Sequence, residues 1–170
     1  CVNYLFSFIK DEKACLQILQ NIDPSFEKAL PVASVGGQDT FIDFEVVGIN
    51  AEINEKVKSR GSYCTSIDAF MKGLRHGKVC IVPIEWKYIE KYPKSNKADG
   101  SSGETRQERY EGLIKAQDSP IKCNEHRNLY YEPFYQLMRQ TLLSHEMVKK
   151  KDYGAEDYQH VHAIPTGNYQ

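Results

Sequence analysis

The residues best suited to chemistry lie at the end of an apolar, strand-like run. Residues 79–84 are mostly apolar and β-branched, a composition typical of a buried strand. Glu85 and Lys87 follow two positions apart, so they project from the same face of that strand. A carboxylate and an ammonium group are costly to remove from water unless they pair or bind a metal ion. The pattern therefore indicates an ion pair or a metal-assisted site.

A second acid can reach the same place. Residues 62–71 are rich in Tyr, Thr, Ile and Phe and predict another strand, while residues 72–78 contain two glycines and predict a hairpin turn. Antiparallel pairing would bring Asp68 beside Glu85 and Lys87. Two carboxylates suit Mg²⁺ or Mn²⁺, and the lysine could then orient or deprotonate a metal-bound water. The structural alternative is a solvated Glu85–Lys87 ion pair with Asp68 near a turn.

The pattern Asp68…Glu85-Trp86-Lys87 resembles the PD-(D/E)xK nuclease superfamily, which has the restriction-endonuclease-like fold. Residues 84–90 and 129–140 are similar to a bacterial group classed with the restriction endonucleases. The resemblance covers residues 40–168, most of the chain. Ile67 stands where the superfamily motif has Pro.

The resemblance implies a metal-dependent endonuclease that hydrolyses DNA phosphodiester bonds and leaves a 5′-phosphate. Asp68, Glu85 and the carbonyl of Trp86 would hold Mg²⁺ (or Mn²⁺), and Lys87 would position the nucleophile. DNA would be the partner, with a homodimer as one assembly open to the protein. The alternative is a catalytically silent nucleic-acid-binding or assembly domain that keeps the nuclease fold.

The long helix expected over residues 132–150 offers supporting residues. Gln136 and Gln140 share a helix face and Arg139 lies beside it. In the resembled family, polar residues of this helix support the catalytic centre or contact phosphate, and the alternative is a surface polar stripe. A third metal-binding acid would come from ahead of the motif strands. The candidates are Glu27, Glu45 and Glu12.

The formal net charge is −1, so DNA binding would need local basic patches rather than global attraction. The hairpin turn supplies Lys72, Arg75, His76 and Lys78, and further lysines follow the motif (Lys91, Lys94, Lys97) or end the long helix (Lys149, Lys150, Lys151). Each group could instead be a solvated face.

His160 and His162 share one face of the last predicted strand, where they could bind a metal ion, contact substrate or be structural. The five cysteines are scattered without a Cys-x-x-Cys pair, which favours free thiols in a reducing, cytoplasmic setting. Cys1 could carry a lipid, but a missing native N-terminus is the favoured explanation for the absent Met. No apolar run is long enough for a membrane helix.

At 170 residues the chain predicts one nuclease-like domain over residues 1–170. Periodicity and breakers predict helices over 11–21, 23–30, 106–116 and 132–150, strands over 40–47, 62–71, 78–86 and 157–165, and a polar loop over 94–106. The expected fold is α/β, with a central mixed (α+β) sheet flanked by helices. Its core order is helix-strand-strand-strand-helix-strand, as in the restriction-endonuclease-like fold.

Overall fold

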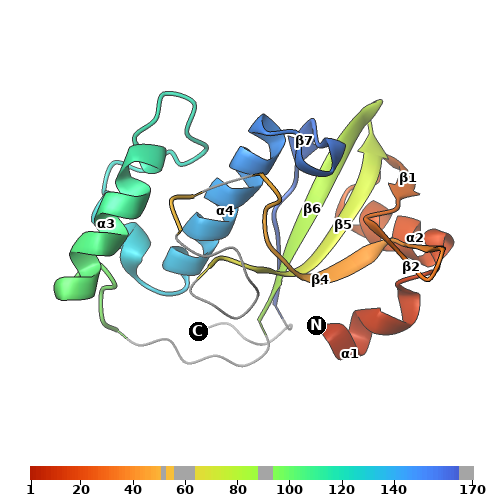
Figure 1. Ribbon diagram of the computed structural model, residues 1–170, viewed down its shortest axis with the longest axis horizontal. Helices are drawn as coiled ribbons and strands as arrows, with labels where there is room; N and C mark the ends of the chain where they lie inside the picture. The colour runs from red at the N-terminus through yellow and green to blue at the C-terminus, as the bar shows by residue number, and fades with distance from the viewer. Residues whose placement is uncertain (51–52, 56–63, 88–93, 165–170) are drawn as a thin grey trace.

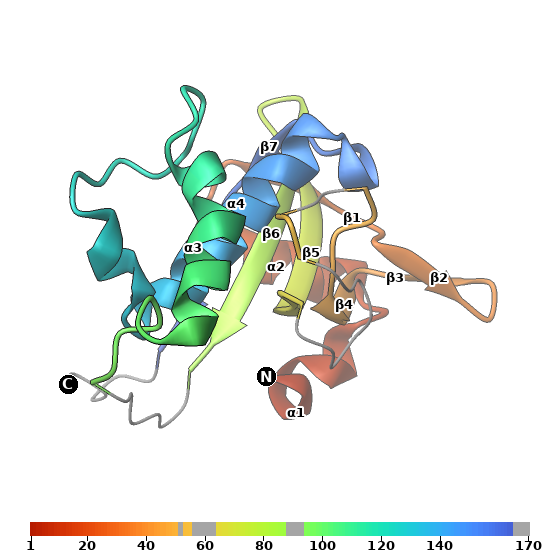
Figure 2. The same ribbon diagram turned by 60° about the vertical axis from the view of Figure 1, so that its left-hand side comes forward.

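The computed structural model describes residues 1–50, 53–55, 64–87 and 94–164. A central sheet lies between helices, with α4 (Phe134–Lys149) on one side and α2 (Glu12–Ile22) on the other (Figure 1). Two more helices are α1 (Val2–Leu5) and α3 (Ser101–Ile114). In the rotated view of Figure 2, α3 lies on the side of α4 that faces away from the sheet. Single 3₁₀ turns cover Phe6–Phe8, His126–Tyr130 and Asp152–Gly154. In these residues no helix has the length and apolar character needed to cross a membrane.

The sheet is mixed, as expected for the α/β class. Its strands are β1 (Phe26–Leu30), β4 (Ile42–Val46), β5 (Ile67–Arg75), β6 (Lys78–Trp86), β7 (Asp157–Tyr158) and β8 (Val161–Ala163), and a separate ribbon joins β2 (Ala33–Val35) to β3 (Gln38–Thr40). β1 and β4 both pair antiparallel with one edge of β5, while β7 and β8 both pair parallel with the far edge of β6. The β5–β6 hairpin is therefore the centre of the sheet.

The turn of that hairpin is tighter than the seven residues expected for it. β5 runs to Arg75 and β6 begins at Lys78, so only His76 and Gly77 connect them. Both have positive φ, 51° and 72°, the backbone that a two-residue hairpin turn requires. The long strands that result carry Asp68 and Glu85 to the end of the sheet far from the turn.

Two apolar cores fill the space on either side of the sheet. Alternate residues of β5 and β6 face opposite cores, because side chains alternate along a strand. One core joins Phe70 and Ile81 to Met138 and Leu142 of α4. The other joins Met71, Val82 and their neighbours to α2 through Leu19 and Cys15. α2 begins as predicted, with the Asp11 carboxylate accepting the Ala14 N–H at 3.0 Å.

Three expectations about the elements were wrong. Residues 26–30 form β1 rather than a helix, because Phe26 and Ala29 are buried and the segment pairs with β5. The polar loop ends at Gly100, and α3 begins at Ser101 instead of residue 106. Helical spacing predicted an apolar stripe of Phe134, Leu137 and Met138 on α4, but Phe134 is 55% exposed, and Met138 is joined in the stripe by Tyr135 and Leu142.

The two glycines of α3 give a matched test of this packing. A Cβ at Gly103 would lie 2.0 Å from the carbonyl oxygen of Ala98, whereas a Cβ at Gly112 would meet nothing within 4 Å. We expect Gly103→Ala to lower the free energy of unfolding by about 1–3 kcal/mol through overpacking. Gly112→Ala should raise it by about 1 kcal/mol through helix propensity. Urea denaturation of both variants checks the result, and equal effects would contradict the placement of α3 on Ala98.

Candidate active site

Four strands bring charged side chains into one row across the sheet. The β5–β6 pairing ends at Ala69–Ile84, so the next step sets Asp68 opposite Glu85. Glu45 lies opposite Asp68, since its neighbours in β4 pair on either side of that residue. On the far edge, β8 sets His162 opposite Glu85. The row Glu45, Asp68, Glu85, His162 therefore crosses β4, β5, β6 and β8 at one level.

Where the backbone pairing of β5 with β6 ends, the side chain of Asp68 takes the place of a backbone hydrogen-bond acceptor. Its Oδ2 accepts the backbone N–H of Trp86 at 2.9 Å. This bond places the Asp68 carboxylate beside the backbone that separates Glu85 from Lys87. Both motif strands thus present their functional groups at the same end of the sheet, as the hairpin spacing predicted.

Glu85 and Lys87 form a buried pair. Glu85 is 1% exposed and Lys87 is 7% exposed. The Lys87 Nζ lies 2.6 Å from the Glu85 Oε1. The alternative of a solvated ion pair is therefore wrong for these two residues, and the cost of burying them must be offset by further hydrogen bonds.

Those hydrogen bonds come from α4. Gln136 contacts both members of the pair: its Nε2 donates to the Glu85 Oε1 at 2.7 Å, and its Oε1 accepts from the Lys87 Nζ at 2.6 Å. Gln140 donates to the other oxygen of Glu85. The expected contact between the shared face of this helix and the Glu-x-Lys pair is present. Gln140 is only 1% exposed, so it is a buried amide and not part of a surface polar stripe.

Burial raises the pKa of the Glu85 carboxyl above its ordinary value. The hydrogen bonds from Lys87 and Gln140 oppose this rise in pKa, and the negative charge of Asp68 adds to it. The direction is the one expected for two carboxylates held close together. The two acids therefore interact electrostatically as well as through the strand register.

A chain of hydrogen bonds continues from Gln140 to His160 and Thr141. The Nε2 of Gln140 also donates to the Ser66 carbonyl at 3.1 Å, so its Oε1 is the acceptor for the Nε2 of His160, 3.1 Å away. Burial and the nearby His162 lower the pKa of His160 to about 4. The ring is neutral at pH 7, and its Nδ1 accepts from the Thr141 hydroxyl at 3.2 Å. His160 thus fixes which end of the Gln140 amide faces Glu85.

From this hydrogen-bond network we predict that the side chain of Gln140 stabilises the folded protein. Gln140→Ala would leave the Glu85 carboxylate, the Ser66 carbonyl and the His160 N–H without this buried partner. We expect a loss of about 3 kcal/mol in the free energy of unfolding, since each unsatisfied buried group costs about 1–3 kcal/mol. The matched control is Gln17→Ala in α2, an exposed amide that bonds Asn21, and it should change stability by less than about 0.5 kcal/mol. Chemical denaturation measures both, and a small loss for Gln140→Ala would contradict its burial.

The open side of the site is a pocket of about 370 Å³. Its lining consists of Cys1, Val2, Asn3, Glu45, Asp68 and Trp86. Glu45 has a positive φ of 53°, and its Oε2 accepts from the Ser66 hydroxyl at 2.9 Å. Glu45 and Asp68 are therefore the acids that face this space, whereas Glu85 is 1% exposed and is not among the residues named in its lining.

Other residues expected at the site lie elsewhere. Glu27 is in β1, where its carboxylate accepts the N–H of Gly77 at the hairpin turn. Glu12 begins the exposed first turn of α2. Arg139 pairs with Glu55 at 2.9 Å, next to the hydroxyl of Tyr110. The sequence did not single out Ser66, Thr141 or Glu55, because each acts through a contact between residues far apart in the chain.

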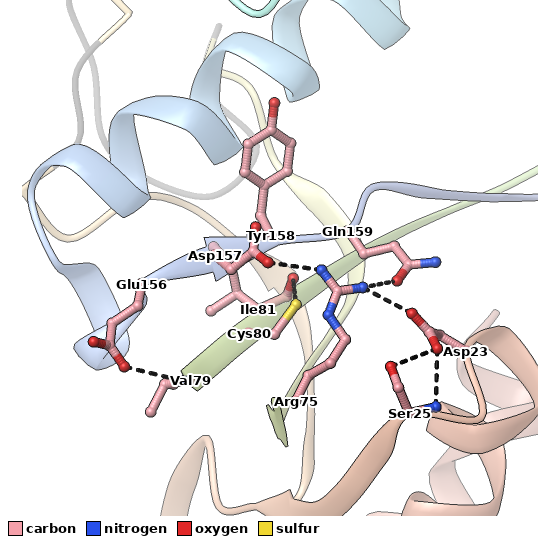
Figure 3. A network of polar contacts seen from close by, with 10 residues as sticks. All are labelled: Asp23, Ser25, Arg75, Val79, Cys80, Ile81, Glu156, Asp157, Tyr158 and Gln159. Atoms are coloured by element: carbon pink, nitrogen blue, oxygen red, sulfur yellow. Dashed lines mark hydrogen bonds and ion pairs between the residues drawn. The ribbon is translucent and has the colours of Figure 1, made fainter. Parts of the chain in front are cut away.

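The basic residues of the hairpin also lie at the far end of the sheet. Arg75 is seven residues from Asp68 along β5, about 20 Å at the rise of an extended strand. Figure 3 shows its guanidinium between the carboxylates of Asp23 and Asp157, at 3.1 and 2.8 Å, with Gln159 as a further acceptor. Lys72 donates to the carbonyl of Tyr153, and Lys78 is exposed. Of the basic residues expected to contact phosphate, Arg75 thus joins β5 to β7 and to the C-terminal end of α2.

In the described residues, His, Cys, Asp and Glu side chains do not gather in groups of three that could hold a metal ion. His160 and His162 belong to the row and network around Glu85 instead of forming a separate metal site. Any cation at this end of the sheet would therefore depend on the carboxylates of Asp68 and Glu85 together with water or substrate oxygens.

Comparison with known proteins gives one family. The model of the family REase-ARP, described as restriction endonuclease associating with ARP, matches residues 1–170. Neither a curated protein nor a solved structure matches the chain.

Proposed function

Since the chain belongs to the REase-ARP family of restriction endonucleases, we propose that it is a metal-dependent endonuclease of the PD-(D/E)xK type that hydrolyses DNA phosphodiester bonds. The observation that carries the proposal is the buried Glu85–Lys87 pair, clamped by Gln136 and set opposite Asp68. A structural ion pair does not require a second acid and an open pocket beside it.

The carboxylates fit a hard divalent cation. Mg²⁺ is commonly held by one or two carboxylates, with waters and substrate phosphate completing its shell, so a third protein acid is not required. The negative charge of Asp68 raises the pKa of Glu85, and a bound cation would relieve this repulsion. When bound, Mg²⁺ or Mn²⁺ would supply an activated water and stabilise charge on the phosphate.

Within this proposal each residue has a defined task. Asp68, Glu85 and the carbonyl of Trp86 would hold the cation, while Glu45 lines the pocket together with Asp68. Lys87 positions the attacking water with its ammonium group. Gln136 bonds both Lys87 and Glu85, so it keeps the ammonium and the carboxylate at a fixed separation.

One observation favours a second function. Both oxygens of Glu85 already accept hydrogen bonds from the amides of α4, which is also what a silent domain that keeps the nuclease fold would show. Such a domain would bind nucleic acid or assemble with a partner, and the family description includes association with ARP.

Cleavage of supercoiled plasmid separates the two functions. The wild-type protein should nick or linearise the plasmid with Mg²⁺ or Mn²⁺ and should be inactive with EDTA. The variant Glu85→Gln/Lys87→Met keeps side-chain volume while removing both charges, and it should be folded and inactive. A wild-type protein that binds DNA but leaves both plasmid and single-stranded DNA intact with either cation would reject the nuclease and favour the silent domain.

A further inference from the structure

An aromatic surface adjoins the acidic pocket. The ring of Tyr4 stacks on the indole of Trp86, with ring centroids 5.5 Å apart and an angle of 15° between the planes. Trp86 lines the pocket together with Asp68, and Figures 1 and 2 both show α1 beside this end of the sheet. The stack therefore places the Tyr4 ring directly against a residue that lines the pocket.

The outer layer of this stack is accessible. Tyr4 is 57% exposed, although one face of its ring is used by Trp86. A second flat ring could lie on the remaining face in the same offset arrangement. Phe6, on the next turn of the chain, is 59% exposed but is not part of this stack.

The charges of the pocket restrict what can bind there. Among the described residues, its lining contains two acids, Glu45 and Asp68, and neither Lys nor Arg. A phosphate would meet these carboxylates through a cation, and the described part of the lining offers no basic side chain to hold the rest of a nucleic acid. Affinity must then come from the cation and from stacking, and stacking needs a base that is not already inside a duplex.

We infer that Tyr4, stacked on Trp86, is a platform for one unpaired base of DNA whose neighbouring phosphate lies at the acidic pocket. The inference rests on the proposed nuclease function and deepens it by naming the substrate class: single-stranded or locally unpaired DNA. A pocket of about 370 Å³ is at the lower end of volumes that hold small ligands, so one nucleotide fits this site better than a duplex does. Base stacking on aromatic side chains is tolerant of sequence.

The test measures binding apart from cleavage. A fluorescent single-stranded oligonucleotide is titrated with the protein in Ca²⁺, and the bases are removed one at a time by abasic substitution. In the wild type, loss of one particular base should weaken binding about tenfold, in line with the strength of base–aromatic stacking. Tyr4→Ala should show the same tenfold loss with the intact oligonucleotide and no further loss when that base is removed.

Two variants of the same segment serve as controls. Tyr4→Phe keeps the stacking ring and should bind within about twofold of the wild type. Phe6→Ala removes an equally exposed ring outside the stack and should also retain affinity. If Phe6→Ala weakened binding as much as Tyr4→Ala, the segment would be a general apolar docking surface and the platform would be rejected.

The outcomes separate this inference from the nuclease proposal. The platform is supported if removal of one particular base weakens binding in the wild type but not in Tyr4→Ala, even if no plasmid is cleaved. Active cleavage with equal rates on single-stranded and duplex DNA, and no effect of Tyr4→Ala on either, would overturn the platform and leave the nuclease in place.

Discussion

Lys87→Ala should reduce DNA cleavage by at least about 100-fold, the usual contribution of a side chain that positions or transfers a proton in the reaction. Lys87 is the cation beside Glu85, at 2.6 Å, and Gln136 cannot replace its charge. Plasmid cleavage in Mg²⁺ measures the loss. The control is Lys115→Ala, which breaks an exposed Lys–Glu pair at the C-terminal end of α3 and should keep the wild-type rate.

The same variant should also be less stable, because removing one partner leaves a buried charge unpaired at a cost of about 3–5 kcal/mol. The loss should depend on pH. Burial holds the pKa of Glu85 above its ordinary value and the bond from Lys87 lowers it, so the variant raises this pKa further. The pKa of Glu85 is higher in the folded variant than in the unfolded chain. At a pH in the range between these two values, the folded variant binds a proton at Glu85 that the unfolded chain does not.

The stability of Lys87→Ala should therefore be closest to wild type at low pH and should fall as the pH rises through that range. Thermal unfolding in EDTA from pH 4 to pH 8 follows the difference, with the range taken from the ordinary pKa of Glu near 4.3. Glu85→Gln/Lys87→Met should recover most of the stability at neutral pH while remaining inactive. Equal deficits at all pH values would show that Glu85 is not the group left unpaired.

Asp68→Asn should abolish most cation binding and lower cleavage at least about 100-fold, because an amide is a weaker ligand for Mg²⁺ than a carboxylate. Stability should be unchanged or slightly higher. The Asn oxygen can still accept the Trp86 N–H, and the substitution removes the negative charge that raises the pKa of Glu85. Calorimetric titration with Mn²⁺ measures the affinity directly.

Glu27→Gln is the matched control for Asp68→Asn. Glu27 is an acid of the same sheet, but it lies at the hairpin turn next to Gly77, and its loss should alter neither cation affinity nor cleavage. Were Glu27→Gln to weaken Mn²⁺ binding as much as Asp68→Asn, the cation would have to lie at the other end of the sheet.

The part of the site that the sequence could predict is the part made by short-range geometry. The i, i+2 phase of Glu85 and Lys87 and the hairpin back to Asp68 both follow from strand periodicity. The i, i+4 spacing of Gln136 and Gln140 likewise predicted a shared face, and that face meets Glu85.

The remaining features of the fold and of the site depended on tertiary contacts. Residues 26–30 contain Glu, Lys, Ala and Leu, which favour helix, but pairing with the edge of β5 overrides that propensity. This shift moved Glu27 out of the helix from which a third acid was expected. Helical spacing also could not tell that Arg139 turns toward Glu55, since that partner lies 84 residues away in sequence.

The origin of the groups around Glu85 has a consequence for the protein while it is being synthesised. The β5–β6 hairpin is complete by Trp86, yet the amides that satisfy Glu85 come 51 and 55 residues later. A nascent chain can therefore carry both motif strands for some time with the carboxylate of Glu85 still hydrated. Translation interrupted before α4 would release a product that contains Asp68, Glu85 and Lys87 but lacks the amides that complete the site. Under the proposed function, cleavage would therefore begin only with molecules in which α4 has docked.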